Sequence, residues 1–457
     1  MQNLEKAVSD FAGILWSWPM IAALFGTHIY LTFKLRGIQL HVFKAIRLSV
    51  SKEEHGVGDV SPFSSLTTAL AATIGTGNIV GVATAIVSGG PGAVFWMWIS
   101  GIFGMSTKYA ESLLSVKYRV KMPDGSMAGG PMYVMERGLH KKWMGMLFAF
   151  FTAIAAFGIG AMVQANSISG MMLKTCAIPP WVTGVTVAVL TSLVIIGGIK
   201  SISKVCSYLI PVMGLFYILS NLLILGLQWY SIPHTIQLIV TSAFSGQAAL
   251  GGFSGAAAKE ACRYGISRGL FSNESGLGSE PIVAAAARTG NPVRQALVSY
   301  TGTFWDTVIL AAVTGIMIVN SGLWTQTSDG GTLTGEVFAA IPVIGPVMLS
   351  LALLTFTFAT CIGWSFYAQK AVEYLLGPRA VRPYQFLYVL LIFIGSVFSI
   401  GAVWNFSDMA NAFMCIPNLF SILALRNVVV KETDQYLWHP RPQSSGNRRY
   451  SARRSRP

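Results

Sequence analysis

Charged residues are scarce in this chain of 457 residues. Asp, Glu, Lys and Arg make up 11% of it, whereas soluble domains contain about 25%. Apolar residues make up 53%, and a soluble protein of this composition would expose large apolar patches to water. The composition argues against a soluble enzyme, a disordered protein and a disulfide-rich secreted domain. It favours an all-α polytopic membrane protein.

Cysteine and histidine are also few, with five and six residues. The cysteines are scattered, odd in number and form no Cys-x-x-Cys pair, so no disulfide framework is predicted. The histidines lack the paired spacing of a structural metal site, and none is expected. The sequence also lacks the G-x-x-x-x-G-K-[S/T] pattern of ATP-binding loops, so nothing indicates that ATP drives the protein.

Long uncharged runs are abundant. Backbone polar groups in lipid must bond within their own segment, so such runs form helices. The first run is too long for the apolar core of a signal peptide, and we expect it to be retained. Eleven spanning helices are predicted, at residues 11–33, 64–88, 92–116, 143–173, 181–199, 205–227, 235–258, 296–319, 342–369, 383–404 and 409–425.

Basic residues fall mostly on one side of these spans. With the N-terminus outside, 29 of the 32 Lys and Arg residues lie in inside segments, as the positive-inside rule requires. The net charge of +14 is therefore mainly a topology signal, and no nucleic-acid partner is expected. We predict a bacterial-type plasma (inner) membrane protein with an outside N-terminus and a cytoplasmic C-terminus. The Arg-rich tail is expected to be disordered, with contact to anionic membrane lipid as the alternative.

Two predicted spans contain glycine clusters near their middles. The first cluster is Ile74-Gly75-Thr76-Gly77-Asn78, and the second is Gly251-Gly252-Phe253-Ser254-Gly255. Interrupted spans at matched positions of two halves are typical of a transporter binding site. Tight helix packing at small residues is the alternative explanation.

The positions of the two clusters predict an internal repeat. When the first helix is set aside, each cluster falls in the first span of a group of five. An odd number of spans per group places the two groups in opposite orientation. We therefore predict a five-plus-five inverted repeat, with an extra N-terminal helix and linker at 1–55, repeats at 56–230 and 231–430, and the tail at 431–457.

An interrupted helix can bind an amino acid and a cation without charged side chains. Its free amides, at the positive end of a half-helix, suit a carboxylate. Its free carbonyls suit a bare cation such as Na⁺. The glycine clusters contain no Asp, Glu, Lys or Arg, which fits this chemistry.

Several long motifs resemble one known family. GGPGAVFWMWISGIFG, starting at Gly89, is similar to the signature of the alanine or glycine:cation symporters, the sodium:alanine symporter family. SPFSSLTTALAATIGTGNIVGVATAI, GGPMYVMERGL, FGIGAMVQANSISG, RGLFSNESGLGSEPIVAAAA and VSYTGTFWDT resemble further blocks of it, within roughly 56–364. Glu280 departs from the small residue expected there. The resemblance implies a leucine-transporter-like fold, sodium-coupled uptake of alanine or glycine, and no cofactor besides the co-transported sodium ion.

The resemblance also implies roles for the first cluster. The Gly-x-Gly-Asn run is similar to the break in neurotransmitter:sodium symporters. By that likeness, amides from Gly75 through Thr76 to Gly77 bind the substrate carboxylate, and Asn78 lies near the substrate or a cation. The carbonyls of Ala71 and Ile74 then reach the sodium ion.

Gln164 lies midway along an otherwise apolar run, where an unpaired amide is costly. Resemblance makes it a substrate contact, and a helix–helix hydrogen bond is the alternative. In the second cluster, Phe253 is a candidate pocket wall and Ser254 a candidate substrate contact. Simple packing is the alternative for the aromatic ring.

Thr357, Thr360 and Trp364 recur at helical spacing and share a face. Hydroxyl oxygens suit a hard cation, so both threonines are sodium candidates opposite Ala71 and Ile74. Thr360 is also a substrate candidate, and Trp364 would cap a small side chain and exclude leucine by its bulk. For the threonines, bonding to carbonyls one turn back is the alternative.

Four charged residues remain. Asp306 lies in mid-span, where a carboxylate is functional by default. It could relay protons or stabilise a gate, or it could be a structural group bonded to Thr303 or Thr307. Glu274 could close a cytoplasmic gate or form an interfacial salt bridge. Lys108 and Glu111 are expected to pair on one helix.

The function predicted is a secondary active symporter for sodium and a small neutral amino acid. A proton-coupled carrier using Asp306 is the first alternative, and a channel is the second. An enzyme is not expected, because the spans contain no convergent nucleophile, base or metal set. Oligomeric state, stoichiometry and the preferred amino acid stay open.

Overall fold

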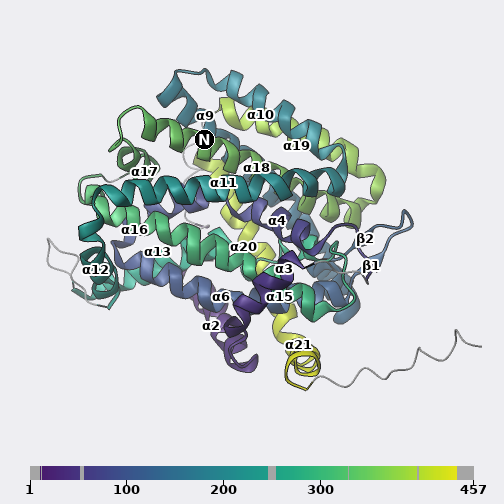
Figure 1. The fold of residues 1–457 in the computed structure, drawn as a ribbon. Coiled ribbons are helices and arrows are strands. Elements are labelled where there is room, and N and C mark those ends of the chain that lie inside the picture. Colours follow the sequence, from purple (N-terminus) through teal and green to yellow (C-terminus); the bar gives the residue numbers. More distant parts are fainter. Residues whose placement is uncertain are drawn as a thin grey trace, which may run out of the picture.

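The computed structural model describes residues 11, 13–51, 56–244, 254–327, 329–398 and 401–439, without the side chains of 254–257 and 401–406. This part of the chain is a bundle of helices (Figure 1) with one short hairpin, β1 (Val120–Lys121) paired antiparallel with β2 (Met127–Ala128). In Figure 1, α9, α10 and α19 lie on one side of the bundle, and α2, α3 and α21 lie on the opposite side.

The first half of the chain contains helices up to 30 residues long. Two are interrupted by π-helical turns, η2 (Gly77–Gly81) and η4 (Ala156–Met162). The helices are α2 (Trp18–Lys34), α3 (Val42–Val50), α4 (Pro62–Thr73), α5 (Val82–Gly89), α6 (Gly92–Lys117), α7 (Pro131–Tyr133), α8 (Lys142–Ala155), α9 (Val163–Cys176), α10 (Pro180–Ile195) and α11 (Gly198–Leu227).

The second half is built similarly, with the π-helical turn η6 (Phe304–Ala311) inside one long helix. Its helices are α12 (Ile232–Phe244), α13 (Ser254–Asn273), α14 (Pro281–Ala284), α15 (Pro292–Thr303), α16 (Ala312–Ser321), α17 (Gly330–Phe338), α18 (Ile344–Leu376), α19 (Val381–Val397), α20 (Gly401–Ala424) and α21 (Arg426–Thr433).

Length and hydropathy identify membrane spans among the described residues. Five continuous helices are long and apolar enough to cross a membrane, and the number reaches seven if each of two bent pairs counts as one span. Helix α10 is apolar but shorter. The predicted total of eleven stays a prediction. The five are Lys142–Cys176, Gly198–Leu227, Pro292–Ser321, Ile344–Leu376 and Pro378–Val397.

Apolar side chains cover the outside of the bundle as well as its interior. Leu193 of α10, Leu219 of α11 and Phe386 of α19 are more than half exposed. A surface of this kind is unfavourable in water and favourable in lipid. The exposed residues therefore agree with a membrane protein.

The first predicted break is confirmed. The segments Pro62–Thr73 and Gly77–Gly89 meet at an angle of 55°. Ser61 caps the first of them by accepting a hydrogen bond from the Ser64 amide. The chain leaves helical geometry at Ile74, whose ψ is 94°, in the glycine cluster that predicted the interruption.

The predicted second break at 251–255 lies mostly outside the described residues. Residues 245–253, between α12 and α13, are not described, so this break stays a prediction. Helix α13 continues to Asn273, beyond the predicted end of the span at 258, and the chain then leaves helical geometry before α14 begins at Pro281. Glu274, Gly276 and Gly278 all have positive φ there. The second break that the structure describes is therefore at 274–280.

The charges of α13 explain why the sequence did not predict this helix. This helix carries Lys259, Glu260, Arg263 and Arg268, so its sequence resembles a cytoplasmic loop. In the structure it packs along α6, with Ala261, Ile266 and Leu270 buried. Tertiary contacts bury its apolar face, although its average composition is not apolar.

The position of α13 also changes the predicted sidedness of its charges. A Cβ atom on Gly89 would lie 3.0 Å from the Ala261 Cα atom. The start of α13 therefore lies at the end of the bundle that was predicted to be outside. Lys259 and Arg263 move to that end, and the excess of inside cations is smaller than the sequence indicated.

Two glycines with the same backbone angle test how tightly the second break is packed. Gly278 and Gly125 both have φ of +85°. A Cβ on Gly278 would lie 2.7–2.9 Å from Pro131, Asn418 and Phe148, whereas Gly125 has nothing within 4 Å. We expect Gly278→Ala to destabilise the protein by about 1–3 kcal/mol more than Gly125→Ala, through overpacking alone. Thermal unfolding in detergent measures this, and equal losses would contradict the packing of the break.

Candidate transport site

The two interrupted helices meet in the middle of the bundle. A Cβ on Gly77 would lie 3.6 Å from the Cα of Ser272, one residue before the end of α13. Asn78 Nδ2 donates to Asp306 Oδ1 (2.9 Å) and to the Asp306 carbonyl (3.0 Å). Ser272 Oγ donates to Asp306 Oδ2 (2.9 Å). The Asp306 carboxylate therefore joins both helices.

Asp306 is fully buried on η6, and donors surround it. Besides Asn78 and Ser272, the Thr307 hydroxyl donates to Oδ2 at 2.7 Å. Thr303, the other expected partner, bonds Ser275 instead (3.2 Å). Both carboxylate oxygens are thus engaged in holding neighbouring elements, as in the structural alternative.

Asn78 also supports the backbone of the first break. Its Oδ1 accepts a hydrogen bond from the Gly75 amide (3.2 Å). The side chain is fully buried and spans from the interrupted backbone to Asp306. Asn78 therefore fixes the orientation of the Gly75 amide, which the sequence predicted to bind a carboxylate.

Two predicted residues from different helices converge on Gly75. A Cβ on Gly75 would lie 2.7 Å from Thr360 Oγ1 of α18 and 3.6 Å from Gln164 Oε1 of α9. Gln164 is 3% exposed, and its Oε1 has no hydrogen-bond partner among the described residues. A buried oxygen without a donor is costly unless a ligand supplies one. The contact explains why this position is glycine.

Thr360 of α18 faces the first interrupted helix, and Thr357 lies one turn before it. Thr360 Oγ1 lies 3.4 Å from the Ile74 carbonyl and 3.0 Å from the Phe356 carbonyl one turn back. Thr357 is fully buried, and its hydroxyl has no partner in the part of the chain that the structure describes. A Cβ on Gly363 would lie 2.7 Å from the Ala72 amide, so α18 packs directly on α4 near Ala71.

Trp364 is placed one turn beyond these threonines and is fully buried. Its Cβ would lie 2.4 Å from a Cβ on Gly160 of η4, and its ring meets Tyr367 edge to face. It packs between α18 and η4 and does not border the large cavity.

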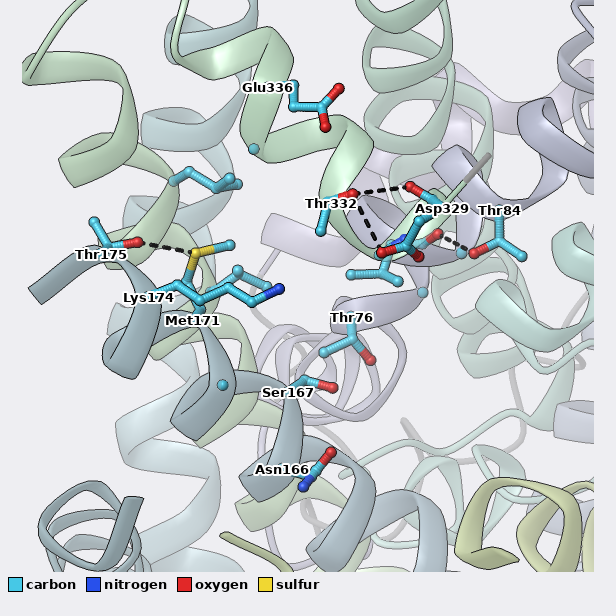
Figure 2. A pocket seen from close by; sticks show the side chains of 18 of the residues that line it. Thr76, Thr84, Asn166, Ser167, Met171, Lys174, Thr175, Asp329, Thr332 and Glu336 are labelled. Atoms are coloured by element: carbon cyan, nitrogen blue, oxygen red, sulfur yellow. Dashed lines mark hydrogen bonds between the residues drawn. The ribbon is translucent and has the colours of Figure 1, made fainter. Parts of the chain in front are cut away.

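A cavity of about 930 Å³ reaches the first break from one end of the bundle. Figure 2 shows Asn166, Ser167 and Lys174 on α9, and Thr332 and Glu336 on α17 across the cavity. Thr76 and Gly77 lie at its inner end, and the Thr76 hydroxyl is buried without a partner among the described residues. The cavity connects the break to one surface of the protein.

Three residues that line the cavity were not predicted from the sequence. Arg268 and Phe271 of α13 and Asp408 of α20 also line the cavity. Phe271 lies within reach of Gly77, since a Cβ there would be 3.8 Å from its Cδ1. The motif RGLFSNES contains Arg268 and Phe271, but the sequence predicted a loop here, after the span 235–258.

The structure places only one of the two candidates in the second glycine cluster. Phe253 lies outside the described residues. Ser254 begins α13, 18 residues before Ser272, which is about 27 Å along a helix. Ser254 is therefore remote from the first break, because the second interruption is at the other end of α13.

One further expectation about charged residues is corrected. Lys108 pairs with Glu280 (Nζ–Oε2 3.0 Å) and not with Glu111, which accepts from Asn418 Nδ2 (2.5 Å). Glu280, where a small residue was expected, is thus the partner of a buried lysine. Glu274 lies buried in the second break, where Ser279 donates to it, and its role at a cytoplasmic gate stays a prediction.

The end of the bundle opposite the cavity is closed by one arginine. Arg119, after α6, donates to four backbone carbonyls: Ala285 (3.0 Å), Ala287 (2.7 Å), Val57 (2.8 Å) and Thr289 (2.9 Å). Val57 precedes the first interrupted helix, and the other three follow the second. Arg119 therefore joins the two helices at that end.

Backbone contacts also join these segments, and together with the four Arg119 hydrogen bonds they form what we call the Arg119 clamp. Val57 pairs with Thr289 and Val60 with Ala287 in isolated bridges. A Cβ on Gly58 would lie 2.3–2.4 Å from the backbone of Ala287 and Arg288. Only a residue without a side chain permits so close an approach.

Two interrupted helices that meet beside a cavity define a multi-pass membrane transporter with the leucine-transporter fold. The crystal structure of MhsT in complex with L-phenylalanine matches with a TM-score of 0.61 and 14% identity, over 83% of this chain and 93% of that one. A Na⁺-coupled sialic acid symporter in a substrate-bound outward-open state matches with a TM-score of 0.51 and 11% identity, over 93% and 87%.

The chain belongs to the sodium:alanine symporter family, whose model matches residues 1–449. It is 46% identical over 445 residues to the sodium/alanine symporter AgcS of Methanococcus maripaludis, covering 95% of this chain and 97% of that protein. It is 45% identical to an uncharacterized transporter of Haemophilus influenzae, covering 95% and 96%. It is 33% identical to the probable sodium/glutamine symporter GlnT of Bacillus subtilis, covering 95% and 91%. The protein is therefore a transporter and not an enzyme.

The Arg119 clamp should control opening of its end. In Arg119→Lys, one ammonium cannot reach four carbonyls, and each lost bond to a charged group removes about 1.5–3 kcal/mol. We expect the amides of Asp59 and Arg288, which bond across the clamp, to exchange hydrogen at least about tenfold faster. Hydrogen exchange with mass spectrometry measures this, with Arg379→Lys as control. Unchanged exchange would show that the backbone bridges hold this end without Arg119.

The space at Gly75 yields a second test. In Gly75→Ala the new methyl group would meet Thr360 Oγ1 at 2.7 Å, and displacement of that side chain should reduce alanine uptake to below about a tenth. Gly81→Ala adds a methyl to the same interrupted helix with nothing within 4 Å, and it should retain uptake. Normal transport by Gly75→Ala would contradict a role for this contact.

Proposed function

We propose that the protein is a secondary active symporter that couples inward sodium movement to uptake of a small neutral amino acid, alanine or glycine, by alternating access. The convergence of Gln164 and Thr360 on Gly75, next to Thr76 and Gly77 of the cavity wall, carries this proposal. The three atoms nearest to a Cβ on Gly75 belong to these two uncharged side chains. A zwitterion and a bare cation match such a site.

The amino acid binds at the break with its carboxylate on the amides of Thr76 and Gly77. The Gly75 amide, the third donor predicted from the sequence, already donates to Asn78 Oδ1. Gln164 Oε1 accepts from the substrate ammonium group. The Thr76 hydroxyl, buried without a described partner, is a further contact. Trp364 limits the space behind Gln164 through its packing on Gly160.

Sodium binds between α4 and α18. Carbonyl oxygens of Ala71 and Ile74 and hydroxyls of Thr357 and Thr360 are its ligands in this proposal. Support comes from the 3.4 Å approach of Thr360 to the Ile74 carbonyl and from the unpartnered, buried Thr357 hydroxyl. Oxygen ligands of this kind suit a hard cation. Because sodium and substrate share Thr360, each should tighten binding of the other.

The names of relatives support sodium and an amino acid as the transported pair. AgcS, at 46% identity, is named a sodium/alanine symporter, and GlnT, at 33%, a probable sodium/glutamine symporter. Alanine is therefore the first substrate to test, with glycine and glutamine beside it.

The order of elements supports a repeat of five plus five spans. In this proposal the first repeat runs from α4/α5 to α11, and the second from α13/α14 to α20, so that α2 is the extra helix. The N-terminus is outside and the C-terminus faces the cytoplasm of a bacterial-type cell, with the protein in the plasma (inner) membrane. Membrane lipid surrounds the protein in this proposal.

Uptake by the purified protein in liposomes tests the proposal. Labelled alanine should accumulate above equilibrium with an inward sodium gradient and not with choline in place of sodium. In Thr360→Ala, loss of a sodium ligand should raise the half-saturating sodium concentration at least about tenfold. In Gln164→Ala, loss of the ammonium partner should raise the KM for alanine by a similar factor.

Thr355 is the matched control on α18. It is half-buried, and its hydroxyl bonds to the Leu351 and Ala352 carbonyls of its own helix. Thr355→Ala should leave both constants unchanged. Equal uptake in sodium and choline would contradict sodium coupling. If Asp306→Asn then also abolished uptake, the proton-coupled alternative would replace it.

A further inference from the structure

A second buried polar cluster lies away from the proposed sodium and substrate sites. Lys108 and Glu111 come from α6, and Glu274 and Glu280 come from the second break. All four are between 1% and 3% exposed. None of them borders the large cavity, and the proposed transport mechanism uses none of them.

The charges of this cluster do not balance. Lys108 Nζ forms an ion pair with Glu280 Oε2 at 3.0 Å, so this one cation faces three carboxyl groups, and no ion pair of Glu111 or Glu274 is found among the described residues. If both were ionised, two excess negative charges would be buried inside a membrane protein, at a cost of several kcal/mol for each. Proton binding removes that cost directly.

Glu111 and Glu274, the two acids without an ion pair, differ in their hydrogen bonds. Ser279 donates to Glu274. Glu111 Oε1 accepts from Asn418 at 2.5 Å, but its Oε2 has no hydrogen-bond partner among the described residues. Glu280 Oε1, 2% exposed, likewise has none. Glu111 therefore has one oxygen free to carry a proton, in a cluster that also contains an acceptor without a donor.

A proton fits this cluster better than a metal ion. Lys108 already occupies the position of a cation beside Glu280. Within the described residues, no group of three or more His, Cys, Asp or Glu side chains has the arrangement to hold a metal. A proton needs neither a coordination sphere nor a connection to the cavity.

The surroundings add no second cation. His28 of α2 bonds Thr107 through Nδ1 (2.7 Å) and faces Gly276. Asp306 has its own three side-chain donors. The remaining titratable groups facing the cluster are Tyr367 of α18 and Cys415 of α20.

Glu111 is connected to the second break through one amide. Asn418 Nδ2 donates both to Glu111 Oε1 and to the Gly276 carbonyl (2.9 Å). A change of charge on Glu111 therefore acts on the same amide that holds the interrupted backbone. Like-charge repulsion from Glu274 and Glu280 would act on the break at the same time.

We propose that Glu111, beside Lys108, Glu274 and Glu280, is a proton-binding site distinct from the sodium and amino-acid sites, and that its proton keeps the second break in its transport-competent position. The proton is bound and released at Glu111 without any covalent chemistry. The proposal does not depend on which cation drives uptake.

Infrared spectroscopy tests proton occupancy without relying on transport. The wild-type protein in liposomes should show the carbonyl stretching band of a protonated carboxyl group, which Glu111→Gln removes. The difference spectrum of the two proteins, recorded from about pH 5 to about pH 9, should contain this band and lose it as pH rises. A difference spectrum without the band at every pH would overturn the proposal.

Uptake tests the consequence for transport. At saturating sodium and alanine, the wild-type rate should fall at least about fivefold over the same pH range, as Glu111 loses its proton. Glu111→Gln, which is always neutral, should vary less than about twofold. Glu432→Gln, which removes the surface partner of Lys117, should follow the wild type. Equal pH dependence in Glu111→Gln and wild type would overturn the control by Glu111.

If the Glu111→Gln variant does not fold, two measurements still test the proposal. Glu111→Asp keeps the acid and should keep a titrating carboxyl band. The wild-type spectrum alone also bears on the proposal, because absence of any protonated carboxyl band that titrates would overturn it. If the band is found but no alanine uptake occurs, the proposed function fails while the proton site stands.

Discussion

The bonding of two interrupted helices inside the protein is the constraint on which the rest of the structure depends. Lipid offers no partner to a free amide or carbonyl, so each interruption must be satisfied by other parts of the chain. At the first break Asn78 Oδ1 accepts from the Gly75 amide. Asp306 holds the side chains beside both breaks: it accepts from Asn78 at the first and from Ser272 before the second. Three segments that are distant in sequence are therefore held by one buried carboxylate.

The same constraint places the other buried charges. Lys108, Glu111, Glu274 and Glu280 surround the second break, and Asn418 links Glu111 to the Gly276 carbonyl. Arg119 satisfies four carbonyls where the chain enters the first interrupted helix and leaves the second. The cavity approaches the first break from the other end. The structure is thus open toward one end and clamped at the other, as one state of an alternating-access cycle requires.

Local patterns predicted the first break and part of the site. The run from Ile74 to Asn78 contains two glycines and no strong helix former. Residues adjacent in sequence are therefore enough to predict its interruption. Gln164 and Thr360 stood out as polar residues in apolar runs, and the structure brings both to Gly75. The break at 274–280 was not predicted, because the glycines at 251–255 gave a stronger local signal than this segment. The charges of α13 also made this partly buried helix resemble a loop in the sequence.

The sequence by itself determined the class of protein, the apolar helices and the first interruption, because composition and spacing are properties of the chain alone. The tertiary structure decided which partners the buried polar groups take. Lys108 bonds Glu280 and not its helical neighbour Glu111, and Phe271 of α13 reaches the cavity. Such pairings join residues far apart in sequence. They depend on which helices pack together and on the cost of burying a charge without a partner.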